Sequence, residues 1–492
     1  MKTIIKHSCF LFLLVFCSCN SWIDITPSDR LSEDMLFEDR QGFGKAINGV
    51  YVGLVDRSLY GRNMSAGVID LMGQLYYYGI GTDFNSLIGA YNYEDEDVKA
   101  VFEAVWEKAY ALIVNCNIII EKCDEKREVL PDVYYGLYKG EAFALRAMLH
   151  LDLLRLFGPV YDESTKTEKC IPYVTNSDTE ISPMLSAEEI LNLVITDLKA
   201  SLELLKDSDP IFTEGVRNEA NADGDNSLNY RQYRLNYYAV KTLLARAYLW
   251  GHDKTNALTV AEEILKEVQV EGAEIFPFVT KEAASSDRMF SSEVMFALYD
   301  SYRGDQVYDE LFIPTLETSK LYTLPGDALP VTDPNGDNTY DDQNDYRFKM
   351  WTTNTDGGKT VPYCKKYEDV TGSGSEKFNK MIPLIRLSEA YFIAAECVGD
   401  IDRAKNYLNK IRTNRNCVSL NPTEGTLMNY IAKEFRREFL GEGQMFFFYK
   451  RNGMTKIPNG RGSEESKGTI NMTTSNYVVP LPDSETSVRL DN

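Results

Sequence analysis

The segment Leu387–Arg412, LSEAYFIAAECVGDIDRAKNYLNKIR, carries the pattern that decides the fold. Small and apolar side chains recur every three or four residues on both sides of a turn at Gly399: Leu387, Ala390, Tyr391, Ala394, Ala404, Leu408 and Ile411. This period places them on one face of a helix, and the alanines allow two helices to approach closely. The segment therefore predicts two helices that pack against each other across a short turn.

A second copy of this arrangement lies at residues 244–265, LARAYLWGHDKTNALTVAEEIL, with its turn at Gly251. Such pairs resemble tetratricopeptide units, whose repeat is about 34 residues. The same period predicts further helices at Gly42–Val55, Val98–Cys123, Tyr134–Phe157, Leu191–Leu205, Tyr230–Trp250 and Thr255–Val268. We therefore expect a mainly all-α fold of tetratricopeptide-like helix pairs.

Two stretches, residues 60–97 and 270–380, lose the helical period and are rich in Gly, Tyr, Asp and Asn. We call them the first and second excursions and predict loops, with short strands in the second. Because loops held by a rigid scaffold commonly carry binding sites, we expect the two excursions to form the binding face. Residues 19–41 are expected to be an extended, acidic lead-in to a single domain spanning residues 19–492.

The N-terminus has the features of a targeting segment. Lys2 and Lys6 precede the nine apolar residues of Cys9–Cys17, CFLFLLVFC. That run fits a signal-peptide core and is too short to cross a bilayer, which needs about 20 residues. The Ser18-Cys19 pair that follows resembles a bacterial lipobox, so we predict removal of residues 1–18 and lipidation of Cys19. Two alternatives stay open: lipidation at Cys17, which would place bulky Phe16 before the modified cysteine, and an ordinary secretory signal.

Composition excludes one class of partner. The chain has 492 residues, 74 acidic against 52 basic, for a net charge of −22. A polymer this acidic repels phosphate, which argues against nucleic-acid binding. The 31 tyrosines suit a wet, ligand-facing surface, although helix packing is an alternative explanation.

A search for catalytic motifs is mainly negative. The sequence has no HExxH, no GxSxG and no CxxC. The run Asp333–Asp337 resembles the start of a calcium loop, but Asn338 and Asn344 stand where an EF-hand needs Gly and Glu, so only an irregular calcium site stays open. Among so many acidic residues, a catalytic carboxylate pair also stays open. We expect no cofactor, no metal and no enzyme activity.

Several blocks then occur in one order over nearly the whole chain. They are Cys19 with Trp22, Asp24 and Pro27, then VWEKAYALIVNCNIIIE (105–121), GEAFALRAMLHLDLLRLFGPV (140–160), IPLIRLSEAYFIAAE (382–396), EFRREFLGEGQMFFFYKR (434–451) and VVPLPDSE (478–485). Together they resemble the SusD/RagB family of outer-membrane nutrient-binding lipoproteins. The family form most often has Arg and Asp near Met445 and Phe448, so this chain resembles a divergent branch.

The resemblance implies a lipoprotein on the cell surface, anchored in the outer membrane above a SusC-like TonB-dependent transporter. Such proteins capture oligosaccharides, or peptides in some branches, and do no covalent chemistry. A degradative enzyme or an adhesin on the same scaffold stays open. Charged residues within the matching blocks are expected to serve helix packing and ion pairing: Glu141, Arg146, Arg386, Glu389, Glu396 and Arg412.

Candidate ligand contacts follow from the chemistry of sugars. Sugar rings stack on Trp and Tyr, while amides and carboxylates bind their hydroxyls. The excursions supply the predicted contacts Tyr76, Tyr77, Tyr78, Asp83, Tyr91, Tyr299, Asp300, Tyr302, Trp351 and Asn354. Trp351 is the leading candidate, because Trp106 and Trp250 lie on predicted helices and are expected in the core.

Overall fold

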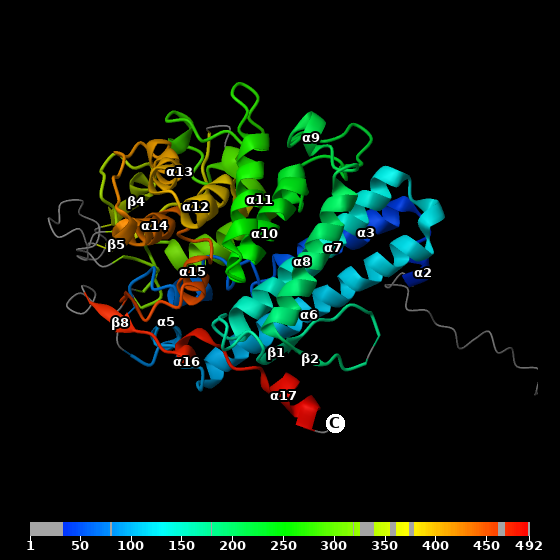
Figure 1. The fold of residues 1–492 in the computed structure, drawn as a ribbon, viewed down its shortest axis with the longest axis horizontal. Helices are drawn as coiled ribbons and strands as arrows, with labels where there is room; N and C mark the ends of the chain where they lie inside the picture. Colours follow the sequence, from blue (N-terminus) through cyan, green and yellow to red (C-terminus); the bar gives the residue numbers. More distant parts are fainter. Residues whose placement is uncertain are drawn as a thin grey trace, which may run out of the picture.

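The computed structural model describes residues 33–78, 81–178, 180–317, 319–324, 339–354, 361–372, 378–460 and 468–490. Long helices form its scaffold (Figure 1): α3 (Arg40–Leu54), α6 (Glu96–Glu125), α7 (Asp132–Phe157), α8 (Ala187–Leu205), α10 (Tyr237–Trp250), α11 (Lys254–Val268), α12 (Leu387–Cys397) and α13 (Ile401–Thr413). From α6 to α13 each of these helices packs on the next, although the second excursion separates α11 from α12 in sequence. The predicted all-α, tetratricopeptide-like fold is confirmed.

Other elements lie around this stack (Figure 1). The helix α14 (Glu424–Glu438) is as long as α3 and α11. The short helices are α2 (Glu33–Leu36), α4 (Val68–Met72), α5 (Phe84–Gly89), α9 (Ile211–Glu214), α15 (Met445–Arg451), α16 (Thr474–Tyr477) and α17 (Asp483–Leu490). The described ranges also contain four antiparallel strand pairs: β1 (Lys169–Pro172) with β2 (Met184–Ser186), β3 (Val294–Tyr299) with β6 (Met381–Arg386), β4 (Trp351–Asn354) with β5 (Val361–Cys364), and β7 (Lys456–Pro458) with β8 (Thr469–Asn471).

Two expectations need correction. Residues 33–36 of the lead-in form α2 rather than extended chain, and the first excursion contains α4 and α5 as well as loops. Asp83 is the N-cap of α5, and its side chain accepts a hydrogen bond from the backbone N–H of Ser86. A third expectation is confirmed, because the short strands predicted in the second excursion are present as β3, β4 and β5.

The predicted helix at Tyr230–Trp250 begins seven residues later than expected. Tyr230 has a left-handed backbone with φ 51°, which ends any helix there, and a 3-10 turn follows at Arg231–Tyr233. The helix α10 then begins after Asn236, whose side chain accepts a hydrogen bond from the Ala239 N–H at 3.1 Å. This break leaves residues 230–236 as a folded loop.

Close packing of α7 on α8 depends on small residues. A Cβ atom added at Gly140 of α7 would lie 2.9 Å from Leu205 Cγ of α8, closer than carbon atoms pack. The start of α8 is fixed by a capping box between Ser186 and Glu189.

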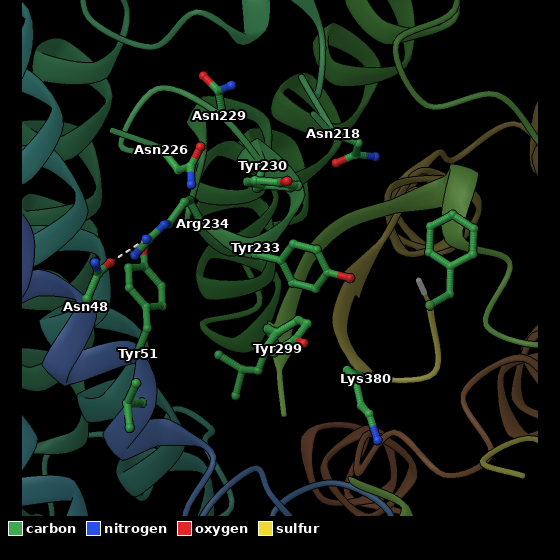
Figure 2. Close-up of a pocket in the computed structure, with 13 residues that line it drawn as sticks. Asn48, Tyr51, Asn218, Asn226, Asn229, Tyr230, Tyr233, Arg234, Tyr299 and Lys380 are labelled. Atoms are coloured by element: carbon green, nitrogen blue, oxygen red, sulfur yellow. Dashed lines mark hydrogen bonds between the residues drawn. The ribbon is translucent and has the colours of Figure 1, made fainter. Parts of the chain in front are cut away.

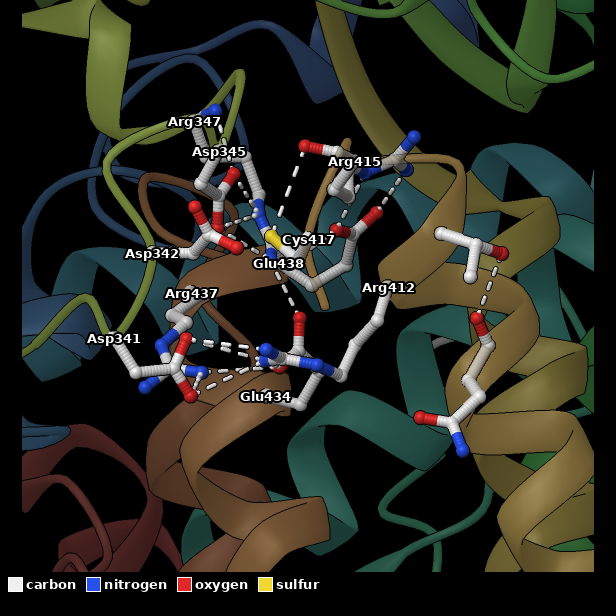
Figure 3. A network of polar contacts seen from close by, with 12 residues as sticks. Asp341, Asp342, Asp345, Arg347, Arg412, Arg415, Cys417, Glu434, Arg437 and Glu438 are labelled. Carbon is white, nitrogen blue, oxygen red and sulfur yellow. Dashed lines mark hydrogen bonds and ion pairs between the residues drawn. The ribbon is translucent and has the colours of Figure 1, made fainter. Parts of the chain in front are cut away.

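Charged side chains in the matching sequence blocks form buried ion pairs, as predicted. The pairs are Arg146–Asp197 (2.7 Å), Glu141–Arg231 (2.8 Å), Arg386–Glu438 (2.6 Å), Glu389–Arg246 (2.6 Å), Arg412–Glu434 (2.7 Å) and Glu396–Arg451. Figure 3 shows the largest group, centred on Glu434 and Glu438 of α14. Burial alone would raise the pKa of Glu434, but the guanidinium groups of Arg347, Arg437 and Arg412 lower it to about 2.

Other expectations about the core are also confirmed. Trp106 and Trp250 are buried, and so are five of the six cysteines after Cys19, Cys397 being half-buried.

No helix in the described ranges combines the length and the apolar character that a membrane span requires. Within those ranges, no group of three or more His, Cys, Asp or Glu residues could hold a metal ion. Cys17, Cys19 and the Asp333–Asp337 run lie outside the described residues.

Candidate ligand-binding site

Five of the ten predicted contacts are buried, and their burial argues against a direct role in ligand binding: Tyr76, Tyr78, Tyr91, Asp300 and Trp351. In the first excursion, the hydroxyls of Tyr78 and Tyr91 form hydrogen bonds with other residues of the same excursion. Both hydroxyls contact the buried side chain of Gln74. Tyr78 donates to the Gly89 carbonyl at 2.8 Å, and Tyr91 donates to the Met72 carbonyl at 2.6 Å. Hydroxyls satisfied in this way belong to the core.

Trp351, the leading candidate, is a packing residue. Only 8% of it is exposed, and its indole Nε1–H donates to the hydroxyl of buried Tyr340 at 3.0 Å. The loop composition around it suggested an exposed side chain, but β4 pairs with β5 and places Trp351 beside Cys364 on the core side. The expectation of a Trp351 platform is therefore corrected.

Residues of both excursions line a cavity of about 250 Å³. We call it the excursion cavity; Asp83, Asn85, Arg62, Glu310 and Lys320 are among its lining residues. The Asn85 amide donates to the Ser319 carbonyl at 2.9 Å and so joins the first excursion to the second. The basic side chains that line the excursion cavity are already paired, since Arg62 contacts Glu310 and Lys320 contacts Glu317.

A larger cavity of about 740 Å³ lies on another part of the surface (Figure 2). We call it the tyrosine pocket. Its lining consists of Asn48, Tyr51, Val52, Asn218, Asn226, Asn229, Tyr230, Tyr233, Arg234, Leu298, Tyr299, Phe378 and Lys380. Four tyrosines and four asparagines together supply flat apolar faces and hydrogen-bonding amides, the combination that sugars need.

The loop of residues 230–236 positions two of the four tyrosines that line the pocket. Arg231 is fully buried, pairing with Asp209 at 2.9 Å and Glu141 at 2.8 Å, and so anchors the loop. The Gln232 amide adds hydrogen bonds of 2.8 and 2.9 Å to the carbonyls of Ser291 and Val294. With these side chains held inside, the neighbouring Tyr230, Tyr233 and Arg234 line the pocket (Figure 2).

The other walls come from α3 and from the ends of two paired strands. Asn48, Tyr51 and Val52 share one face of α3 because they are three and four residues apart. Tyr299 ends β3 and is 59% exposed, whereas every earlier residue of that strand is buried. Its ring meets the ring of Tyr233 edge to face, with centroids 5.8 Å apart.

Hydrogen-bonding capacity remains in the lining. The amide nitrogen of buried Asn229 donates to the Glu219 carbonyl at 2.6 Å, and that of Asn218 donates to Gln232 at 2.8 Å. Within the described part of the chain, neither of their Oδ1 atoms accepts a hydrogen bond. Both oxygens are buried, so they are unpaired acceptors behind the pocket wall and are not contact points on its surface.

The remaining predicted residues are divided between these sites. Tyr299 lines the tyrosine pocket and Asp83 the excursion cavity, while Tyr302 is 64% exposed outside both linings. Tyr77 is half-buried, and its backbone N–H donates to the Thr323 carbonyl at 2.6 Å. The backbone of Asn354 ends β4, and its side chain lies outside the described structure.

Of the residues that line the pocket, only Tyr299 is among the predicted contacts. The helical period places Tyr230, Tyr233 and Arg234 in the expected helix at Tyr230–Trp250, and Tyr51 in the scaffold helix at Gly42–Val55. The stretch 218–236, NEANADGDNSLNYRQYRLN, has the Asn-rich, Tyr-containing composition of the two excursions and was the available signal.

Comparisons with known proteins agree with this architecture. The family model described as "SusD family" matches residues 208–489, and one described as "Starch-binding associating with outer membrane" matches residues 45–214. SusD-like protein P2 of Formosa agariphila is 22% identical, covering 98% of this chain and 96% of the relative.

Solved structures show the same fold. A SusD superfamily protein of Bacteroides thetaiotaomicron superposes with TM-score 0.70 at 23% identity, covering 92% of this chain and 98% of that one. Surface glycan-binding protein A of the same species, solved with laminarihexaose, has TM-score 0.64 at 16% identity, covering 91% and 97%.

The stack of paired helices defines a protein of the helical-repeat class. The family match covers more than half of the chain, and the chain therefore belongs to the SusD family.

Proposed function

We propose that this protein is a non-catalytic cell-surface receptor that captures oligosaccharides in the tyrosine pocket. It passes them to a SusC-like TonB-dependent transporter in the outer membrane, where it is held by a lipid on Cys19. The observation that carries the proposal is the lining of the pocket, with tyrosine faces for sugar rings and asparagine amides for hydroxyls. Its volume of about 740 Å³ suits a ligand of several sugar units.

The test is calorimetric titration of the purified protein with a panel of oligosaccharides, repeated with two variants. Tyr299→Ala removes an exposed ring from the pocket, and Tyr302→Ala removes a similarly exposed ring three residues away and outside its lining. A base stacked on an aromatic ring gains about 1–3 kcal/mol. The free energy of a sugar stacked on Tyr299 should lie near the lower end of that range. Loss of the Tyr299 ring should therefore weaken binding about tenfold.

The control variants show which cavity holds the sugar. Tyr302→Ala should bind like the wild type. If Tyr299→Ala also binds normally while Asn85→Ala does not, the glycan occupies the excursion cavity instead. If no member of the panel binds while a peptide library does, the peptide alternative replaces the glycan proposal.

The enzyme alternative needs a separate assay, because binding and turnover are different observations. The purified protein should release no new reducing ends from any polysaccharide that it binds. A steady release that disappears on mutation of one carboxylate pair would establish a degradative enzyme.

A further inference from the structure

The lining of the tyrosine pocket carries positive charge only. Arg234 and Lys380 are its charged side chains, and no Asp or Glu belongs to the described lining. This departs from the chain as a whole, in which 74 acidic residues outnumber 52 basic ones. We propose that the pocket selects an acidic oligosaccharide, one whose rings bear a uronate carboxylate or a sulfate ester. The inference rests on the proposed function, since it takes the pocket as the glycan site.

Arg234 supplies the main argument. Its guanidinium donates to Asn48 Oδ1 and lies 4.6 Å from the centre of the Tyr51 ring. Across the described ranges it forms no ion pair within 4.0 Å, whereas Arg231, three residues earlier, pairs with two carboxylates. Arginine has five N–H donors, so Arg234 retains donors for a ligand.

The surroundings of Arg234 favour an anion over a neutral group. A guanidinium binds a carboxylate or sulfate through two parallel hydrogen bonds, which are stronger than bonds to a neutral hydroxyl. The Asn48 amide and the Tyr51 ring hold the side chain without neutralising its charge. The phenol of Tyr51 is itself tied inward, donating to Glu141 at 2.8 Å. Arg234 is therefore a positioned cation with no ion-pair partner within 4.0 Å in the part of the chain that the structure describes.

Lys380 plays a secondary part. Its Nζ lies 3.8 Å from Asp369 Oδ2, and buried Asp300 interacts with it electrostatically, so its charge is partly compensated. Figure 2 shows Arg234 and Lys380 on opposite sides of Tyr233 and Tyr299. This arrangement places the anionic substituent beside Arg234 and the sugar rings over the tyrosines.

The test uses sugars that differ only in charge. The purified protein is titrated calorimetrically with tetragalacturonate and its methyl ester, and with a sulfated galactan tetrasaccharide and its desulfated form. The two arms distinguish a uronate from a sulfate. Arg234→Gln removes one of the two positive charges of the lining and leaves Lys380, whose charge is partly compensated. Arg403→Gln is the matched control, since it makes the same change in net charge on α13, outside the pocket lining. Melting temperatures check that both variants fold.

In at least one arm the charged sugar should bind at least tenfold more tightly than its neutral partner. Arg234→Gln should abolish that preference, and Arg403→Gln should keep it. Neutral sugars that bind as tightly as charged ones, or more tightly, would overturn the inference and leave the proposed function standing. A charge preference that survives Arg234→Gln would also overturn it. Absence of binding by every sugar would remove both proposals together.

Discussion

At the scale of single residues, Trp351 shows why aromatic side chains in loop-like sequence need not face a ligand. Its indole is buried and donates its N–H to Tyr340 at 3.0 Å. Trp351→Ala should lower the free energy of unfolding by about 3–5 kcal/mol, the usual cost of a large aromatic-to-alanine cavity. Chemical denaturation measures the loss, and calorimetry on the folded fraction should find unchanged affinity. A tenfold weaker affinity at an unchanged melting temperature would restore Trp351 as a ligand platform.

Glu434 provides a second test at this scale, because its carboxylate lies among three arginines with no exposure to water. Glu434→Gln leaves those charges unbalanced and should cost about 3–5 kcal/mol of stability in urea denaturation. Glu424→Gln, at the exposed start of the same helix, is the control and should change stability by less than about 1 kcal/mol.

The pH dependence of stability follows from the same site. The folded-state pKa of Glu434 is about 2, below its ordinary value of 4.5, so the folded state holds its proton less tightly than the unfolded state. Its contribution is present above pH 4.5 and is lost as the pH falls toward 2. Between these limits the wild type should lose about 3 kcal/mol that Glu434→Gln does not lose. Parallel stability curves for the two proteins in acid denaturation would contradict this assignment.

At the scale of helices and strands, α7 and α8 depend on the absence of side chains where they touch. A Cβ atom at Gly136 would lie 2.9 Å from the Leu204 carbonyl oxygen, whereas one at Gly49, on the exposed face of α3, would meet no atom within 4 Å. Gly136→Ala should therefore destabilise the protein by about 1–3 kcal/mol. Gly49→Ala should stabilise it by up to about 1 kcal/mol through helix propensity. Thermal unfolding measures both, and a neutral Gly136→Ala would mean that α8 can shift away.

The same scale shows what the sequence could predict. The helices α6, α7 and α11 were predictable because apolar residues recur every three or four positions through each of them. The start of α10 was not, because Tyr230 and Arg231 continue the apparent pattern, and only the positive φ of Tyr230 and the ion pairs of Arg231 break the helix there. That misplaced boundary hid Tyr230, Tyr233 and Arg234, three of the thirteen residues that line the tyrosine pocket. Tyr299 was predictable, since it follows a buried strand at the entrance to a loop.

At the scale of the whole molecule, the proposed receptor is anchored in the outer membrane. Cys19 follows Ser18 at the end of an apolar run, which predicts a lipid on that cysteine. Cys19→Ala should move the protein from the membrane fraction to the soluble fraction, measured by fractionation and immunoblotting. Release caused by Cys17→Ala instead would move the lipid to the alternative cysteine, and retention of both variants would contradict lipid anchoring.

The most direct test of the central claim is a crystal structure of the protein with the oligosaccharide that binds best in the calorimetric panel. We expect electron density for sugar rings in the tyrosine pocket, in contact with Tyr299 and Tyr233, with a carboxylate or sulfate within hydrogen-bond distance of Arg234. Density for the sugar in the excursion cavity, with an empty tyrosine pocket, would contradict it.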